Sequence, residues 1–122
     1  MNTDTTILLV DDSEMVLALL SFQLQTAGYQ VIGAADGKQA FQLLDGRSID
    51  LVITDLNMPH MNGLELINQI RATEGYQYMP VVLFVSEDTE DKEHIKTSGA
   101  TALLVKDQVS EKLNRLLKKM IR

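Results

Sequence analysis

The chain has 122 residues, no cysteine, and 11 Lys and Arg against 17 Asp and Glu, a net charge of −6. This length suits one ordinary domain, and the lack of cysteine excludes disulfides, zinc–thiolate sites and a thiol nucleophile. Acidic residues outnumber basic ones, so the chain as a whole lacks the positive charge that nucleic-acid binding requires. The four-residue apolar run near the N-terminus is too short for a signal peptide or a membrane span. We therefore expect one cytoplasmic domain over 1–122, with no nucleic-acid or membrane partner.

In the first half of the chain, short apolar runs alternate with helical patterns. A strand at 7–10 leads into a helix that Asp12 or Ser13 caps and Gly28 ends. The buried face of this helix is expected to hold Val16, Leu19, Leu20, Leu24 and Ala27. A second strand at 30–34 and a short helix that starts at Asp36-Gly37 follow.

The second half repeats this alternation. A third strand at 50–54 is followed by a loop and by a helix with Leu66, Ile67 and Ile70 at core spacing. A fourth strand follows Pro80, and a fifth spans 100–105. Further helices are predicted over 88–98 and over about 109–121, the last with an apolar face.

Five strand–helix units with bare apolar strands such as LVI and VVLFV indicate a parallel sheet that helices bury on both faces. Right-handed crossovers leave few topologies for such a chain. We predict an α/β fold, a flavodoxin-like three-layer α/β/α sandwich with the strand order 2-1-3-4-5.

Polar residues stand at the carboxyl ends of four predicted strands. Asp11 and Asp12 follow the first strand and Asp55 the third, while Ser86 and Lys106 end the fourth and fifth. In the proposed strand order these ends lie along one rim, where ligands of open parallel sheets bind. Taken singly, each residue has an ordinary structural reading as a helix cap, an Asx-turn or a solvated lysine. The polar character of all four ends favours a site.

Three close carboxylates repel one another, so either one is protonated or a cation lies among them. A small cluster of hard oxygen ligands suits Mg²⁺. Together with a lysine and a hydroxyl group, such a site is suited to hold a phosphoryl group. Neither a glycine-rich phosphate loop nor a general-base histidine accompanies it, which makes a carboxylate the expected nucleophile.

Four segments resemble the successive motifs of the receiver domain of two-component response regulators, and they cover nearly the whole chain. They read ILLVDDS, DLVITDLNMPHMNGLELINQIR, PVVLFVS and GATALLVK. The stretch DLNMPHMNGLEL is especially similar to the single-domain, CheY-like members.

The resemblance implies a role for each matching residue. Asp55 would accept a phosphoryl group from a histidine kinase or phosphotransfer protein. Mg²⁺ would be bound by Asp11, Asp12, Asp55 and the backbone carbonyl of Asn57. Ser86 and Lys106 would bind phosphoryl oxygens. Such a protein is a phosphoacceptor switch that catalyses its own phosphorylation and dephosphorylation rather than an enzyme. It would contact a downstream protein through the helix at 88–98, the strand at 100–105 and the helix at about 109–121.

The chain departs from the family pattern in four places. Asp107 replaces the usual proline after the lysine, Leu103 stands where many members carry an aromatic residue, and Glu87 follows Ser86 where a small residue is usual. The segment between Ser86 and Gly99 is about two residues shorter than in typical members. These departures affect the loop after strand five, the switching mechanism and access to the phosphoryl group.

Three other functions remain as alternatives. The first is a receiver-like interaction module that is not phosphorylated, which the full set of matching site residues disfavours. An aspartyl-phosphate phosphatase would carry its nucleophile after strand one, whereas here the candidate follows strand three. A flavodoxin would need a Ser/Thr/Gly-rich phosphate loop after strand one, where this chain has Asp11-Asp12.

Overall fold

The computed structural model describes residues 5–44, 48–58, 60–85, 99–105 and 115. Within these residues the elements are β1 (Thr6–Val10), α1 (Glu14–Thr26), β2 (Gln30–Ala34), α2 (Gly37–Leu43), β3 (Leu51–Asp55), α3 (Gly63–Ala72), β4 (Val81–Val85) and β5 (Ala102–Val105). No helix in this described part of the chain has the length and apolar character needed to cross a membrane. The helices predicted over 88–98 and 109–121 lie outside the described residues, except for the helical Arg115.

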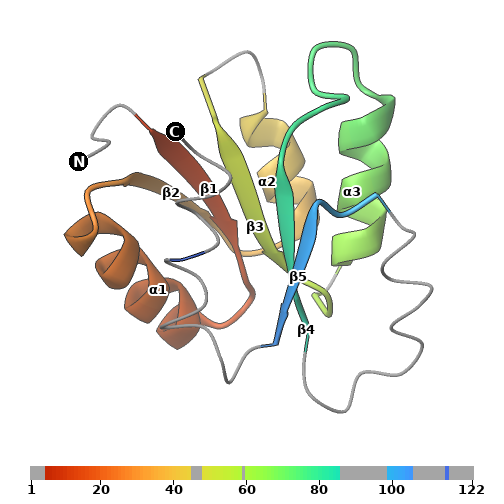
Figure 1. Ribbon diagram of the computed structural model, residues 1–122. Coiled ribbons are helices and arrows are strands. Elements are labelled where there is room, and N and C mark those ends of the chain that lie inside the picture. The colour runs from red at the N-terminus through yellow and green to blue at the C-terminus, as the bar shows by residue number, and fades with distance from the viewer. Residues whose placement is uncertain (1–4, 45–47, 59, 86–98, 106–114, 116–122) are drawn as a thin grey trace.

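The five strands form one parallel sheet in the order β2-β1-β3-β4-β5, as the sequence predicted. Figure 1 shows the sheet with α1 on one side and with α2 and α3 on the other. The predicted strand boundaries are correct to within two residues. One difference matters for the site: β3 runs to Asp55, so this residue is the last of a buried strand rather than the first of a loop.

Successive side chains of each strand point to opposite faces of the sheet and so build two hydrophobic cores. On β1, Leu8 and Val10 join the core under α2 and α3, while Ile7 and Leu9 join the core under α1. Every residue of β3 and of β4 is buried, which is typical of central parallel strands. The three-layer arrangement predicted from the apolar runs is therefore confirmed.

Both predicted ends of α1 are confirmed. Ser13 is the N-cap, and its side-chain Oγ accepts a hydrogen bond from the backbone N–H of Val16 at 3.3 Å. Gly28 follows the helix with a φ of 102°, a left-handed conformation that glycine adopts at little cost. The backbone N–H of Tyr29 reaches back to the carbonyl oxygen of Leu24 at 3.0 Å.

The predicted buried face of α1 is partly wrong. Leu20 and Leu24 are buried as expected, but Leu19 is 59% exposed and Ala27, the C-cap residue, is exposed. Leu17 takes the place of Leu19 against the sheet. The helix carries a second apolar stripe with Met15, Leu19 and Phe22, and helical periodicity alone does not tell which stripe faces the sheet.

Candidate functional site

The pairing of β1 with β3 brings the candidate acidic residues to one edge of the sheet. Val10 pairs with Thr54, so Asp11 and Asp55, the next residue in each chain segment, lie beside each other. This edge is formed by the carboxyl ends of the strands, near the lower end of β3 and β4 in Figure 1. It is the edge at which the sequence predicted a site.

Asp11, Asp12 and Asp55 converge there as predicted. Each offers one carboxylate oxygen, and these three oxygens all lie within 4.8 Å of one another. Asp11 is 1% and Asp55 is 5% exposed, whereas Asp12 is open to solvent. Carboxylates at this separation repel each other unless a proton or a cation lies between them. The donor set consists of hard oxygens with one solvent-facing member, which fits Mg²⁺ with part of its water shell retained.

Asp11 is fixed by the start of α1 and by the end of β2. Its Oδ1 accepts a hydrogen bond at 2.9 Å from the backbone N–H of Ser13, the residue that caps α1. Its own backbone N–H donates to the carbonyl oxygen of Ala34 at 3.1 Å. A buried carboxylate held in this way keeps one orientation, as a metal ligand must.

Asp55 is fixed between β3 and β4. Its Oδ1 accepts a hydrogen bond from the backbone N–H of Leu56 at 2.8 Å, and the same N–H lies 3.1 Å from the carbonyl oxygen of Phe84. The buried Thr54 adds a further bond, because its Oγ1 donates to the carbonyl oxygen of Asp55 at 3.0 Å. The Asp55 carboxylate therefore has a defined orientation at the edge of the sheet.

The loop after Asp55 is short and is closed at its base. The backbone N–H of Gly63 donates to the carbonyl oxygen of Leu56 at 2.8 Å. Asn62 and Glu65 then form a capping box, in which each side chain accepts a hydrogen bond from the other residue's backbone N–H, at 2.9 and 3.1 Å. Asn57, whose backbone carbonyl the family resemblance implicated, lies exposed within this loop. Met58 and Met61 are partly buried and pack against the core.

The other candidate residues lie outside the described part of the chain. The last residues of β4 and β5, Val85 and Val105, pair with each other. Ser86 and Lys106 directly follow them in sequence, and neither belongs to the described residues. The same holds for Glu87 and Asp107.

Leu103, at the position where many relatives carry an aromatic residue, is half-buried on β5 and packs against the core that includes α3.

Two residues that support the site were missed in the sequence. A Cβ atom at Gly63 would collide with the carbonyl oxygen of Asp55 and lie 2.8 Å from Cδ1 of Leu83. The strand pattern of the sequence includes Thr54 but does not indicate its hydrogen bond to the carbonyl oxygen of Asp55. No local sequence signal marks Gly63, because the contact that excludes a side chain there joins the start of α3 to the end of β3.

Comparison with known proteins agrees with this geometry. The family model for the response regulator receiver domain matches residues 7–118. The chemotaxis response regulator CheY4 of Vibrio cholerae is 35% identical, with a TM-score of 0.87 over 96% of this chain and 98% of that chain. The receiver domain of a Pseudomonas aeruginosa sensor histidine kinase, solved with a magnesium ion coordinated in the active site cleft, is 27% identical, with a TM-score of 0.88 over 96% of this chain and 97% of that one.

Among curated relatives, the alkaline phosphatase synthesis transcriptional regulatory protein PhoP of Bacillus subtilis is 31% identical over 117 residues, which are 95% of this chain. The chain spans 48% of PhoP and a smaller share of other relatives that it matches. The match to the family model covers nearly all of the sheet and both acidic strand ends. The chain belongs to the receiver domain family of two-component response regulators and has the CheY-like fold.

Proposed function

We propose that this chain is a receiver that is switched by phosphorylation of Asp55. A histidine kinase or a phosphotransfer protein supplies the phosphoryl group, and the phosphorylated chain changes its binding to a downstream protein. The single observation that carries this proposal is the convergence of Asp11, Asp12 and Asp55, whose carboxylate oxygens lie within 4.8 Å of one another.

The acidic cluster fits a Mg²⁺ site in this proposal. Asp11, Asp12, Asp55 and the backbone carbonyl of Asn57 are the proposed ligands. Mg²⁺ is bound in proteins by one or two carboxylates, with waters and phosphate oxygens completing its shell. The ion supplies positive charge that lowers the repulsion between the carboxylates and an incoming phosphoryl group. The magnesium ion in the active site cleft of the Pseudomonas aeruginosa receiver supports this assignment.

In the transfer step, a carboxylate oxygen of Asp55 attacks the phosphorus atom of the donor. The new O–P bond forms as the bond between phosphorus and the donor's histidine nitrogen breaks, and the nitrogen keeps the electron pair. The hydrogen bond from the N–H of Leu56 to Oδ1 of Asp55 orients the nucleophile for in-line attack. The hydroxyl of Ser86 and the ammonium of Lys106 are the proposed partners of the other phosphoryl oxygens.

The proposed output surface comprises the helix predicted over 88–98, β5 and the helix predicted over about 109–121. Of these elements the described residues include β5, whose residues other than Leu104 are half-buried. β5 pairs with β4, and β4 in turn pairs with the strand that carries Asp55. A change at the phosphorylated residue therefore has a short path to this surface.

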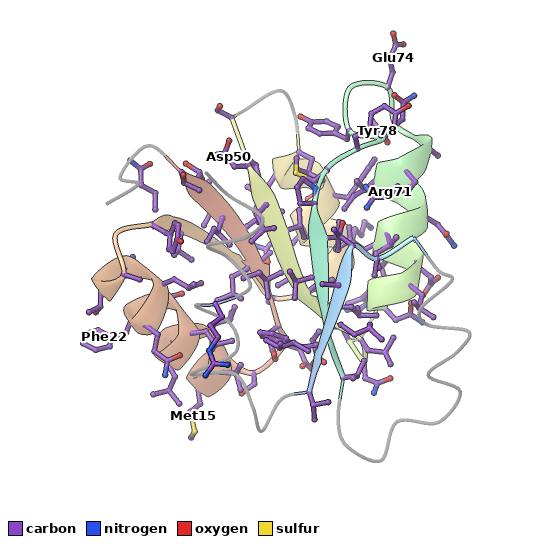
Figure 2. All side chains as sticks on the ribbon, viewed as in Figure 1. Met15, Phe22, Asp50, Arg71, Glu74 and Tyr78 are labelled. Atoms are coloured by element: carbon purple, nitrogen blue, oxygen red, sulfur yellow. The ribbon has the colours of Figure 1, made fainter. Side chains whose placement is uncertain are left out.

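Intact-mass measurement after incubation with Mg²⁺ and acetyl phosphate tests the proposal. Wild type is expected to gain the mass of one phosphoryl group, and chelation of Mg²⁺ by EDTA is expected to prevent the gain. The variant Asp55→Asn should gain nothing. Asp50→Asn is the matched control, because Asp50 is exposed at the opposite end of β3 and loses the same charge (Figure 2).

Two results would contradict the assignment. One is a gain of mass in Asp55→Asn equal to that of wild type, which would place the phosphoryl group elsewhere. The other is the lack of any gain in wild type and Asp50→Asn, which would favour an interaction module that is not phosphorylated.

A further inference from the structure

The junction between β2 and α2, residues 34–37, contacts both loops that carry the proposed metal ligands. On one side its first residue, Ala34, accepts the hydrogen bond from the backbone N–H of Asp11 at 3.1 Å. On the other side its last residue, Gly37, lies against Met61 in the loop between β3 and α3. No residue of the junction is itself a proposed ligand.

The contact between Gly37 and Met61 is so close that only glycine fits. A Cβ atom at Gly37 would lie 2.6 Å from the carbonyl oxygen of Met61 and 3.0 Å from its Cβ and Cγ atoms. Gly37 is buried although it is the first residue of a surface helix. The first turn of α2 therefore rests directly on the backbone of the loop that carries Asn57.

That loop is fixed at both of its ends. Its base is closed by the hydrogen bond from the N–H of Gly63 to the carbonyl oxygen of Leu56 at 2.8 Å. Its far end is fixed by the capping box of α3. Asn57 and Met61 both lie between these fixed points, so we expect a shift of Met61 to alter the position of Asn57.

The junction is itself held by two reciprocal hydrogen bonds. The side chain of Asp36 accepts from the backbone N–H of Gln39 at 2.7 Å, and Oε1 of Gln39 accepts from the backbone N–H of Ala35 at 2.7 Å. The N-terminal turn of α2 consequently has a fixed position relative to Ala34, and hence relative to Asp11.

We propose that Gly37 is a positioning residue for the Mg²⁺ site, because it sets the distance between the loop of Asn57 and the acidic pair. This inference rests on the proposed function, since it assumes that these loops together bind the ion. Mg²⁺ demands near-ideal octahedral geometry, and metal–ligand distances tolerate changes of only about 0.2 Å. A methyl group at Gly37 would lie 2.6 Å from the carbonyl oxygen of Met61, so α2 and this loop have to move apart by more than that.

The test compares Gly37→Ala with wild type and with Gly33→Ala. Gly33, on the neighbouring β2, has open space where a Cβ atom would go, so it controls for the loss of a glycine. Amide NMR spectra of the metal-free proteins and Mg²⁺ titrations are recorded for all three. We expect Gly37→Ala to shift the amide signals of residues 56–58 and 60–62 before metal is added and to weaken Mg²⁺ binding by about 10-fold or more, as substitutions behind metal ligands do. Gly33→Ala should match wild type in both measurements.

A second pair of variants tests the inference without added bulk, in case Gly37→Ala fails to fold. Gln39→Ala removes the acceptor of the Ala35 N–H and loosens the junction, whereas Gln42→Ala changes an exposed glutamine on the same helix. Gln39→Ala should weaken Mg²⁺ binding and Gln42→Ala should not.

The possible outcomes separate this inference from the proposed function. Unshifted loop signals, or wild-type Mg²⁺ affinity in both Gly37→Ala and Gln39→Ala, would overturn the role of the junction while leaving the metal site intact. Absence of Mg²⁺ binding in wild type and in Gly33→Ala would overturn the proposed metal site and this role together.

Discussion

The guanidinium group of Arg71 donates two hydrogen bonds to the carbonyl oxygen of Gly99, from Nε at 3.1 Å and from Nη2 at 2.8 Å. Its Nη1 donates to the carbonyl oxygens of Gln77 at 3.2 Å and Met79 at 2.7 Å. Arg71 lies in the last turn of α3, and Figure 2 shows it beside the segment that carries Tyr78. One side chain therefore ties α3 to the segments that precede β4 and β5.

Replacement of Arg71 by alanine should lower the free energy of unfolding by about 2 kcal/mol, because the carbonyl oxygens lose a charged donor. Arg71→Lys should recover only part of this loss, since an ammonium group cannot bond three carbonyl oxygens with the planar fork of a guanidinium. Urea denaturation measures both effects. Lys38→Ala, which removes an exposed positive charge from α2, is the control; an equal loss in this variant would assign the effect to net charge.

The two apolar stripes of α1 give a second prediction with a matched pair. Leu24 is fully buried and Leu19 is 59% exposed on the same helix. Leu24→Ala should cost about 2–5 kcal/mol of stability because it leaves a cavity in the core under α1. Leu19→Ala should change stability by less than about 0.5 kcal/mol. Similar losses in the two variants, measured by chemical denaturation, would show that Leu19 is also buried in solution.

This pair also shows where prediction from sequence succeeds and where it ends. The bare apolar runs of β3 and β4 and the alternation with helices were sufficient to predict the parallel sheet and its order, because few topologies satisfy them. The order in turn predicted that Asp11 and Asp55 lie side by side. The orientation of α1 could not be predicted in the same way, since both of its stripes are apolar and only packing against the sheet distinguishes Leu17 from Leu19.

The contacts of Gly63 and Gly37, which support the site, could not be predicted from the sequence either. Whether Gly63 fits behind Asp55 depends on a contact between the start of α3 and the end of β3, which no local pattern encodes. The same is true of Gly37 and Met61. Ser86 and Lys106 were identified through the family resemblance together with their places at strand ends, and their roles remain predictions.

Gly63 allows a prediction in which two effects have opposite signs. In a helix interior alanine is favoured over glycine by about 0.5–1 kcal/mol, so helix propensity alone predicts that Gly63→Ala, at the first residue of α3, is stabilising by at most this amount. The added Cβ, however, would collide with the carbonyl oxygen of Asp55 and with Leu83. We expect the collision to dominate and the variant to lose about 1–3 kcal/mol, the usual cost of overpacking. A melting temperature above that of wild type would contradict the close approach of α3 to Asp55.

Removal of the Asp12 charge should make the metal-free protein more stable. The Asp12 carboxylate adds like charge beside the buried Asp11 and Asp55, at oxygen separations below 4.8 Å, and the repulsion opposes folding when no cation is present. Asp12→Asn relieves this repulsion at nearly constant shape, so its melting temperature in EDTA should exceed that of wild type by a few degrees. Glu14→Gln is the control: it removes the same charge two residues later, from the first turn of α1, where the helix dipole favours an acid. Its melting temperature should stay level or fall.

Addition of Mg²⁺ should give wild type a higher melting temperature than Asp12→Asn, the reverse of their order in EDTA. A ligand that binds only the folded state stabilises it by RT ln(1 + [L]/Kd), about 1.4 kcal/mol at a concentration ten times Kd. Wild type should gain this amount and Asp12→Asn much less, because the variant lacks one proposed ligand oxygen. Thermal melts without Mg²⁺ measure the effect of the lost charge, and melts with Mg²⁺ measure the gain from metal binding. A lower melting temperature for Asp12→Asn in EDTA would mean that the Asp12 charge is compensated within the folded chain, and an equal gain from Mg²⁺ in both proteins would remove Asp12 from the ligand set.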